Sequence, residues 1–346
     1  MNTTGLVKYA GAMGALAILS GCGGALRQGQ DDMAVAPSTA ALNVAYVGRT
    51  LSVNGRPITA ARLSPLPSYA AILPDRHTKS KTFEYVINYY GTYASIFDYP
   101  KSDQEIGMIK GLGGQGCTNV LYGYGKKIFW NVAGQNQIEE FRVEKKLIKT
   151  LSVAYSFPSS CAMNTSGDLA VGILSASGPG AGDVVIFKNA SGSGTAYATP
   201  LDEEFFDGYD NEGNLFADGF AGGSSTGFAL VELPKGSTKF ETIKTSNTVE
   251  FPGSVQWDGT YLTVFDQDTN EMYQYTVSGT TATLKGTVTF SGSSDCAQTW
   301  IVQGLVYCGD AGNGNGEVFN YPAGGSPVAT FTGQFDVPLG VVAAEK

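Results

Sequence analysis

The feature that most constrains this fold is a repeat, in which one pattern recurs at intervals of roughly 40 to 50 residues. Each repeat begins with a small or polar entry, continues as a short strand, turns near a glycine and returns as a second apolar strand. Two further strands follow before the next repeat begins. Four antiparallel strands per repeat are typical of the blades of a β-propeller, whose sheets are arranged around an axis. The five repeats begin at Gly113, Phe157, Phe205, Phe251 and Ser293.

The two ends of the repeat region supply a sixth, divided repeat. Residues 86–109 predict three strands without a first strand, and residues 336–343 predict an entry and a first strand without the rest. Joining these ends would close a ring and leave no edge strand open to unwanted pairing. The sequence therefore predicts an all-β fold, a six-bladed β-propeller over residues 79–346, with four antiparallel strands per blade and a closing blade shared between the chain ends.

The composition agrees with a β protein and excludes one class of partner. Only 15% of the residues are charged, while 46 are Gly, 18 are Tyr and 18 are Phe, which favours aromatic-rich strands and frequent turns. The formal net charge is −9, and Lys and Arg form no cluster. Because neutralising phosphates requires a basic face, nucleic acid is not expected as a partner.

The N-terminal segment predicts export. Lys8 is followed by an apolar run, residues 10–19, that is too short to span a bilayer. The run ends in Leu19-Ser20-Gly21-Cys22, which resembles the bacterial lipobox, where a cysteine after two small residues receives a diacylglyceryl group. Cys22 is therefore the predicted lipidation site, and the membrane of the cell envelope, at the outer membrane or cell surface, is the predicted location. An ordinary secretory signal with a chance cysteine is the alternative.

Three regions follow from these features. Residues 1–21 are the predicted lipoprotein signal peptide and residues 79–346 the propeller. Residues 22–78 carry scattered Pro and Ala with no sustained period, which predicts a flexible tether that holds the propeller away from the membrane.

Four cysteines remain beyond Cys22, and an exported chain favours their oxidation to disulfides. Cys117 and Cys161 occupy the same position in neighbouring repeats, which predicts a bridge between two blades. Cys296 and Cys308 lie on successive strands of one repeat, which predicts a bridge within a blade. Unpaired core cysteines are the alternative for each pair.

Acidic and amide side chains recur at the first-strand entry and after the second strand, two places that propeller geometry brings to one face. The stretch 266–270 has alternating acidic and amide residues, but lacks the glycine and glutamate that an EF-hand needs next. A rim of carboxylates favours cations, so Ca²⁺ at Asp218, Asp266 and Asp310 is one hypothesis, and solvated turns are the other. The candidate binding residues at the channel mouth are Asn131, Asp207, Asp218, Asp266, Asp268, Asp295, Asp310 and Asp336.

No catalytic residue is predicted. The chain has no Gly-x-Ser-x-Gly elbow, and its single histidine, His77, precedes the repeats. Aromatic residues near the first strands, among them Trp257 and Trp300, could stack on a sugar or a peptide, or could fill the space between blades.

Several phrases resemble a family of exported bacterial six-bladed propeller lipoproteins, distantly similar to NHL-repeat and streptogramin-lyase propellers. They include FPGSVQWDG from residue 251, DQDTNEMYQYTVSG from residue 266 and YPAGGSP from residue 321. The resemblance covers about residues 79–346 and implies a fold and export but no activity. The predicted function is a binding or scaffolding module for a protein, peptide or carbohydrate ligand. A metal-dependent, lactonase-like hydrolase or lyase at the channel mouth is the alternative.

Overall fold

The computed structural model divides the chain into two units, Met1–Ser64 and Pro65–Lys346. In the first unit three strands form an antiparallel sheet in the order β1-β2-β3, and they fall within the predicted tether. These strands are β1 (Val44–Val47), β2 (Thr50–Val53) and β3 (Arg56–Pro57). The described residues are 44–47, 50–53, 56–57, 71–72, 81–88, 93–110, 114–132, 136–143, 147–153, 158–174, 182–222, 227–335 and 337–346.

Three residues discussed from the sequence lie outside the described residues: Cys22, His77 and Asp336. The lipid anchor, the signal peptide and the tether therefore stay predictions. Within the described part of the chain, no helix is long and apolar enough to cross a bilayer.

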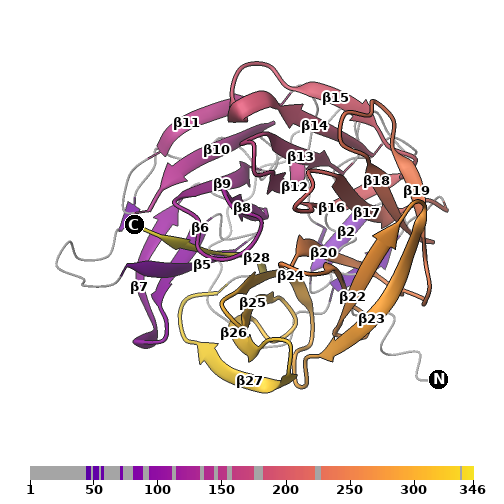
Figure 1. The fold of residues 1–346 in the computed structure, drawn as a ribbon. Coiled ribbons are helices and arrows are strands. Elements are labelled where there is room, and N and C mark those ends of the chain that lie inside the picture. Colours follow the sequence, from indigo (N-terminus) through magenta and orange to yellow (C-terminus); the bar gives the residue numbers. More distant parts are fainter. Residues whose placement is uncertain are drawn as a thin grey trace. The chain divides into compact units, whose positions relative to one another are not determined.

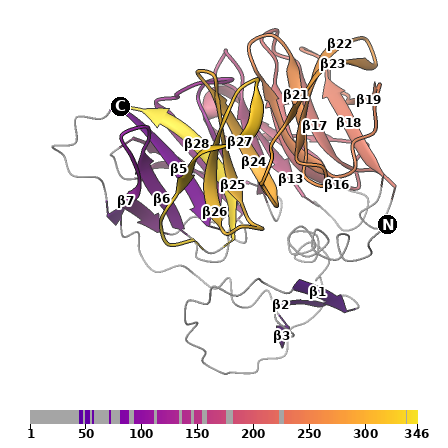
Figure 2. The same ribbon diagram turned by 90° about the horizontal axis from the view of Figure 1, so that it is seen from below.

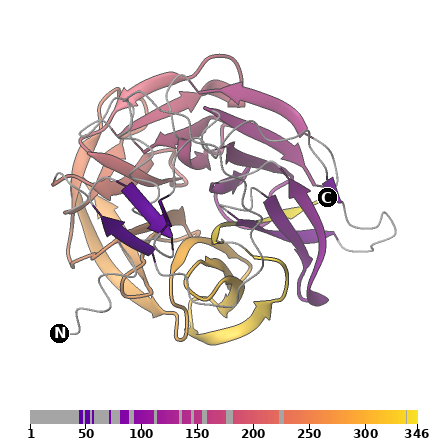
Figure 3. The same ribbon diagram turned by 180° about the vertical axis from the view of Figure 1, so that it is seen from behind.

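The second unit has a propeller arrangement, with antiparallel sheets placed around an axis (Figure 1). Figure 2 shows these sheets from the side, and Figure 3 shows the ring from the opposite end of the axis. Three of the sheets contain four strands joined in sequence order, as the repeat predicts. Their strands are β8 (Gly116–Thr118), β9 (Lys127–Val132), β10 (Gln137–Arg142) and β11 (Leu147–Ser152); β12 (Pro158–Met163), β13 (Leu169–Ile173), β14 (Asp183–Phe187) and β15 (Thr195–Ala198); and β24 (Cys296–Val302), β25 (Leu305–Asp310), β26 (Asn315–Asn320) and β27 (Gly324–Phe331).

Two further repeats are joined edge to edge into one eight-stranded sheet, which the sequence does not predict. The long outer strand β23 reaches β19, and the two pair in parallel over only two residue pairs, Lys244 with Thr281 and Thr245 with Ala282. The remaining pairings in this sheet are antiparallel. The strands are β16 (Glu203–Tyr209), β17 (Leu215–Phe220), β18 (Phe228–Leu233) and β19 (Glu241–Thr245), then β20 (Pro252–Trp257), β21 (Leu262–Asp266), β22 (Glu271–Ser278) and β23 (Thr281–Thr289).

The two ends of the repeat region share the last sheet. The C-terminal strand β28 pairs antiparallel with β5, with Val341 opposite Val86, as the divided repeat predicts. A short strand from residues 71–72 adds to the outer edge of this sheet, within the region predicted to be a tether. The order is β28-β5-β6-β7-β4. The strands are β4 (Ala71–Ile72), β5 (Thr82–Asn88), β6 (Tyr93–Asp98), β7 (Ser102–Lys110) and β28 (Pro338–Glu345).

The position of each strand in its sheet explains its residue pattern. The first strands lie nearest the axis and pack on one another in the ring order β8-β12-β16-β20-β24-β28, with β28 packing on β8 (Figure 1). Neighbouring sheets cover both faces of these strands, so β24 and nearly all of β28 are buried. Outer strands such as β23 and β27 alternate between buried or half-buried and exposed residues, because one face meets solvent.

Tight turns and disulfides complete the ring as predicted. Gly213 has a φ of 92°, the left-handed conformation that the Asn-Glu-Gly-Asn turn requires. The disulfide between Cys117 and Cys161 joins β8 to β12 of the neighbouring sheet. The second disulfide, between Cys296 and Cys308, joins β24 to β25 within one sheet.

Candidate functional site

The first strands surround a cavity at the axis of the ring. It is partly open to solvent, and residues of β8, β12, β16, β20 and β24 line it. Its wall combines aromatic and apolar residues with small polar ones. The aromatic residues are Phe206, Tyr209, Trp257 and Trp300. The polar ones are Gln115, Ser160, Asp207, Ser254, Gln256, Gln298 and Thr299.

One wall of the cavity is a loop between β8 and β9, residues 119–126, which we call the strap. Val120 and Leu121 of the strap line the cavity. The Gln256 side-chain amide donates to the Leu121 carbonyl (3.2 Å), and the Trp300 indole donates to the Gly123 carbonyl (2.9 Å). Further along, the backbone of the strap bonds to β28. The strap is therefore tied to three other first strands, and the sequence repeat does not predict it.

Most polar side chains in the wall hold the first strands together, because these strands share no backbone ladder. Gln298 on β24 accepts the backbone N–H of Gly116 (3.2 Å) and of Val341 (3.0 Å), and it donates to the Gly116 carbonyl (2.6 Å). Ser254 on β20 accepts the N–H of Thr299 (2.6 Å). These bonds use both acceptor positions of the Gln298 amide oxygen and one of its two N–H groups.

A buried glutamate performs the same task between β12 and β16. The Glu204 carboxylate accepts the hydroxyls of Ser159 (2.6 Å) and Ser160 (2.8 Å). Gly172 makes room for it, since a Cβ there would lie 2.0 Å from the carboxylate. Burial raises the pKa of Glu204 well above its ordinary value, and the neighbouring Asp207 adds to the shift.

Three side chains in the wall are buried but have oxygens without a hydrogen-bond partner among the described residues. They are both carboxylate oxygens of Asp207, the amide oxygen of Gln115 and the hydroxyl of Thr299. Each residue is no more than 5% exposed. Gln115 directly precedes β8, Asp207 lies on β16 and Thr299 on β24, so the three come from alternate first strands around the axis. Buried polar atoms normally have partners, so ordered water or another molecule is expected to complete these groups.

The cavity wall contains one acidic side chain and no described basic one. Among the described residues that line the cavity, Asp207 is the one carboxylic acid, and no Lys, Arg or His accompanies it. Burial raises the pKa of Asp207 to about 7, while the nearby Ser160 hydroxyl and Gly172 backbone oppose this shift. Behind it lie Glu204 and the equally buried Asp218, whose pKa is raised by burial and by the charge of Glu204. A cation in the cavity would favour the charged form of this acidic group.

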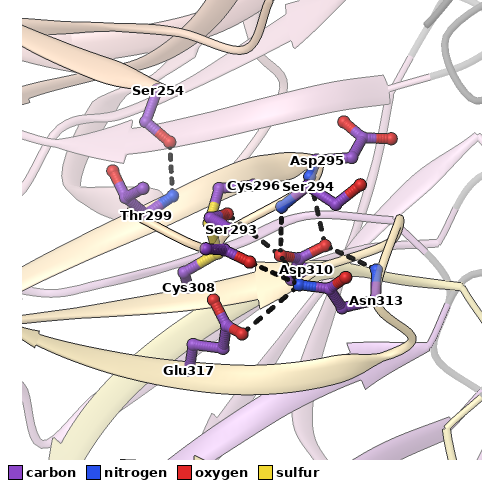
Figure 4. The surroundings of a disulfide bond; sticks show 11 residues. Ser254, Ser293, Ser294, Asp295, Cys296, Thr299, Cys308, Asp310, Asn313 and Glu317 are labelled. Atoms are coloured by element: carbon purple, nitrogen blue, oxygen red, sulfur yellow. Dashed lines mark hydrogen bonds between the residues drawn. A yellow bond between two sulfur atoms is a disulfide. The ribbon is translucent and has the colours of Figure 1, made fainter. Parts of the chain in front are cut away.

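Two predicted residues, Asp310 and Asp266, have their carboxylates engaged with the backbone of their own sheets. Figure 4 shows Asp310 at the end of β25, accepting the N–H groups of Ser294 (2.8 Å) and Asp295 (3.1 Å) at the entry to β24. Asp266, at the end of β21, accepts those of Glu250 (2.8 Å) and Phe251 (3.2 Å) before β20. Burial raises the pKa of Asp266, while these bonds lower it. The recurrence seen in the sequence thus corresponds to a clasp between the first and second strands.

The other predicted residues lie in different surroundings. Asp218 is buried and accepts the N–H of Gly253 in the neighbouring repeat (3.2 Å). Asp295 is buried, and burial raises its pKa to about 7 with a contribution from Asp310. Asn131 is buried, with its side-chain amide unpartnered among the described residues, whereas Asp268 is exposed. Of the candidates that the structure describes, Asp207 alone lines the axial cavity.

One group of side chains has the spacing of metal ligands. Ligand atoms of Cys296, Asp310 and Glu317 lie within 4.8 Å of one another, the single such group among the described residues (Figure 4). The sulfur of Cys296 is bonded to Cys308, so it cannot act as a thiolate ligand. The group therefore does not fit a metal ion while this disulfide is present.

The fold and this cavity define the class: an all-β propeller with a cavity on its axis. No known protein family matches the sequence, and no curated protein is similar to it. Solved structures are similar in fold. A structure of a nidogen–laminin complex shares 11% identity and a TM-score of 0.59, over 76% of this chain and 98% of the other. A protein of unknown function from Bacteroides caccae shares 13% identity and a TM-score of 0.56, over 77% and 100%.

At these identities the similarity shows the fold alone. A streptogramin B lyase structure is also similar, with 13% identity over 63% of this chain and 68% of the other. Its TM-score of 0.42 is too low to support an argument about activity.

Proposed function

We propose that this chain is an exported lipoprotein whose six-bladed β-propeller binds a small ligand in its axial cavity. The observation that carries the proposal is the set of buried oxygens of Gln115, Asp207 and Thr299 without partners in the cavity wall. Leaving a buried polar group unpaired costs about 1–3 kcal/mol, so three such residues in one wall are expected only where a ligand or ordered water completes them.

The blade count in this proposal depends on the eight-stranded sheet. Its two halves are joined by only two residue pairs, between outer strands. Each half has its own first strand, β16 or β20, in the ring around the axis. Counting the halves as two blades, together with the three four-stranded sheets and the sheet shared by the chain ends, gives six.

A binding role is better supported than the metal-dependent hydrolase or lyase. The metal-ligand group among the described residues includes a disulfide sulfur, and Asp266 and Asp310 accept backbone N–H groups instead of facing the axial cavity. The cavity wall contributes hydrogen-bond acceptors and aromatic surface, the usual features of a small-molecule site.

Filling the cavity tests the binding role. Ala162 lines the cavity, so Ala162→Phe places a ring where the ligand would sit. We expect small polar molecules that raise the melting temperature of the native protein to leave this variant unaffected. Ala196→Phe, on the exposed outer strand β15, is the matched control and should respond like the native protein. A ligand that stabilises all three proteins equally binds elsewhere and counts against the axial site.

Export and anchoring are tested at Cys22. The proposal expects labelled fatty acid to be incorporated into the native chain and the protein to remain with the membrane fraction. Cys22→Ser should lose the label and move to the soluble fraction. A native chain that carries no label would contradict the proposed lipid anchor.

A further inference from the structure

The free hydrogen-bonding groups of the axial cavity are oxygens. Those of Gln115, Asp207 and Thr299 have no partner among the described residues. Carboxylate and amide oxygens accept hydrogen bonds, and a hydroxyl oxygen accepts as well as donates. The nitrogen of Gln298, by contrast, is already used in bonds between strands. We therefore expect a ligand that carries several hydrogen-bond donors.

The acidic side chain in the wall also restricts the class of ligand that we expect to bind. The carboxyl of Asp207 lines the cavity without a Lys, Arg or His among the described residues around it. A buried carboxylate without a counter-charge is costly, and a positively charged ligand would remove that cost.

The arrangement of these oxygens favours one kind of cation. The three residues belong to alternate first strands, so they approach the axis from three sides. A primary ammonium group carries three N–H donors on one nitrogen, as in the lysine side chain. The aromatic residues Phe206, Tyr209, Trp257 and Trp300 line the same cavity and could contact the apolar body of such a ligand or the cation itself.

We infer that the ligand of the axial cavity is a small organic ammonium ion, held by the carboxylate of Asp207 and the oxygens of Gln115 and Thr299. This inference rests on the proposed binding function and names its ligand class. An organic cation can contact the aromatic wall of this cavity, whereas a bare Ca²⁺ ion needs six or more oxygens close together.

The pH dependence of binding follows from the same residue. Titratable groups that interact with Asp207 are Glu204 and Tyr209 on β16 and Asp218 on β17. Burial raises the pKa of Asp207, so acidification protonates it before an ordinary surface aspartate. An ammonium ligand loses its counter-charge when this happens, and its affinity should fall as the pH is lowered from slightly alkaline to slightly acidic values.

Calorimetry on the full-length chain in detergent tests the inference with 2-phenylethylammonium as the probe. The neutral analogue 2-phenylethanol has the same ring but no charge, and CaCl₂ tests a metal ion in the same experiment. We expect the amine to bind, and the alcohol to bind at least tenfold more weakly. Asp207→Asn should weaken binding of the amine at least tenfold, since a hydrogen bond between two charged groups is stronger than one to a neutral partner. Asp268→Asn, which removes an exposed carboxylate outside the cavity, is the matched control and should bind normally.

The possible failures are distinguishable. Equal affinity for amine and alcohol, unchanged amine binding by Asp207→Asn, or tight binding of calcium without the amine would each overturn the ammonium assignment. If a neutral or anionic molecule binds and Ala162→Phe blocks it, the binding function stands while the ligand class is wrong. If no molecule in the screen distinguishes Ala162→Phe from the native protein, the proposed function fails as well.

Discussion

Single buried carboxyl groups determine how this protein should respond to pH. Glu84 is fully buried on β5, where it accepts the N–H of Tyr99 (2.9 Å) and the hydroxyl of Tyr124 (3.4 Å). Burial is the main cause that raises its pKa from 4.5 to about 8. The folded protein therefore holds a proton on Glu84 at neutral pH that the unfolded chain has released, and stability should fall as the pH rises between these two values.

Glu84→Gln tests this relation, because an amide resembles the protonated carboxyl. Native protein should lose on the order of a few kcal/mol of unfolding free energy between about pH 5 and about pH 9, and the variant should lose less. Urea denaturation at both pH values measures the difference. Glu250→Gln, at an exposed carboxylate, should keep the native pH dependence. If the unfolding free energy of native protein and of Glu84→Gln depended on pH in the same way, the pKa of Glu84 would not be raised by folding.

Among the structural elements, the first strands are held to one another by side-chain hydrogen bonds. They surround the axis without a shared backbone ladder, so side chains such as Gln298, Ser254 and Glu204 join one to the next. Gln298 alone serves three backbone groups on β8 and β28. These contacts keep the cavity wall in place, and Asp207 is the described carboxyl that lines it.

Gln298→Ala should therefore destabilise the ring strongly for a polar substitution. It leaves two N–H groups and one carbonyl without their partner in a buried place, which we expect to cost about 2–4 kcal/mol of unfolding free energy. Chemical denaturation measures this cost. The control Gln104→Ala removes an exposed glutamine on β7 and should change stability by less than about 0.5 kcal/mol. An equally small change in unfolding free energy for Gln298→Ala would show that its hydrogen bonds between the first strands are not needed for stability.

For the whole molecule, closure depends on contacts between residues far apart in the sequence. The C-terminal strand β28 completes the sheet that begins with β5. The Cys117–Cys161 disulfide joins two neighbouring sheets across 44 residues, whereas Cys296–Cys308 spans 12 residues within one sheet. A longer loop loses more entropy when it is closed in the unfolded chain.

Removing each disulfide should reveal this difference. In the chain-entropy account, replacing Cys117 and Cys161 by serine costs about 4 kcal/mol, and the same change at Cys296 and Cys308 costs about 3 kcal/mol. Denaturation of the two double variants, compared with the native protein under oxidising conditions, measures both. A larger loss from the shorter loop would contradict an entropic origin and point to local packing around Cys296.

The sequence predicts the periodic part of this structure better than the site. Strands, the turn at Gly213 and both disulfides follow from local patterns that repeat along the chain. The strap does not repeat, and Gln298 bonds to Gly116 across 182 positions, so spacing reveals neither. The recurrence of Asp266 and Asp310 is real, but its physical cause is a backbone clasp that spacing alone cannot distinguish from a ligand site.

The axial cavity is the central claim, and a crystal structure of the full-length chain with 2-phenylethylammonium tests it most directly. The account predicts ligand density on the axis, with the ammonium nitrogen within hydrogen-bonding distance of the Asp207 carboxylate and the ring against the aromatic wall. Density for the amine only at the outer surface, with the oxygens of Gln115, Asp207 and Thr299 contacting nothing, would contradict it.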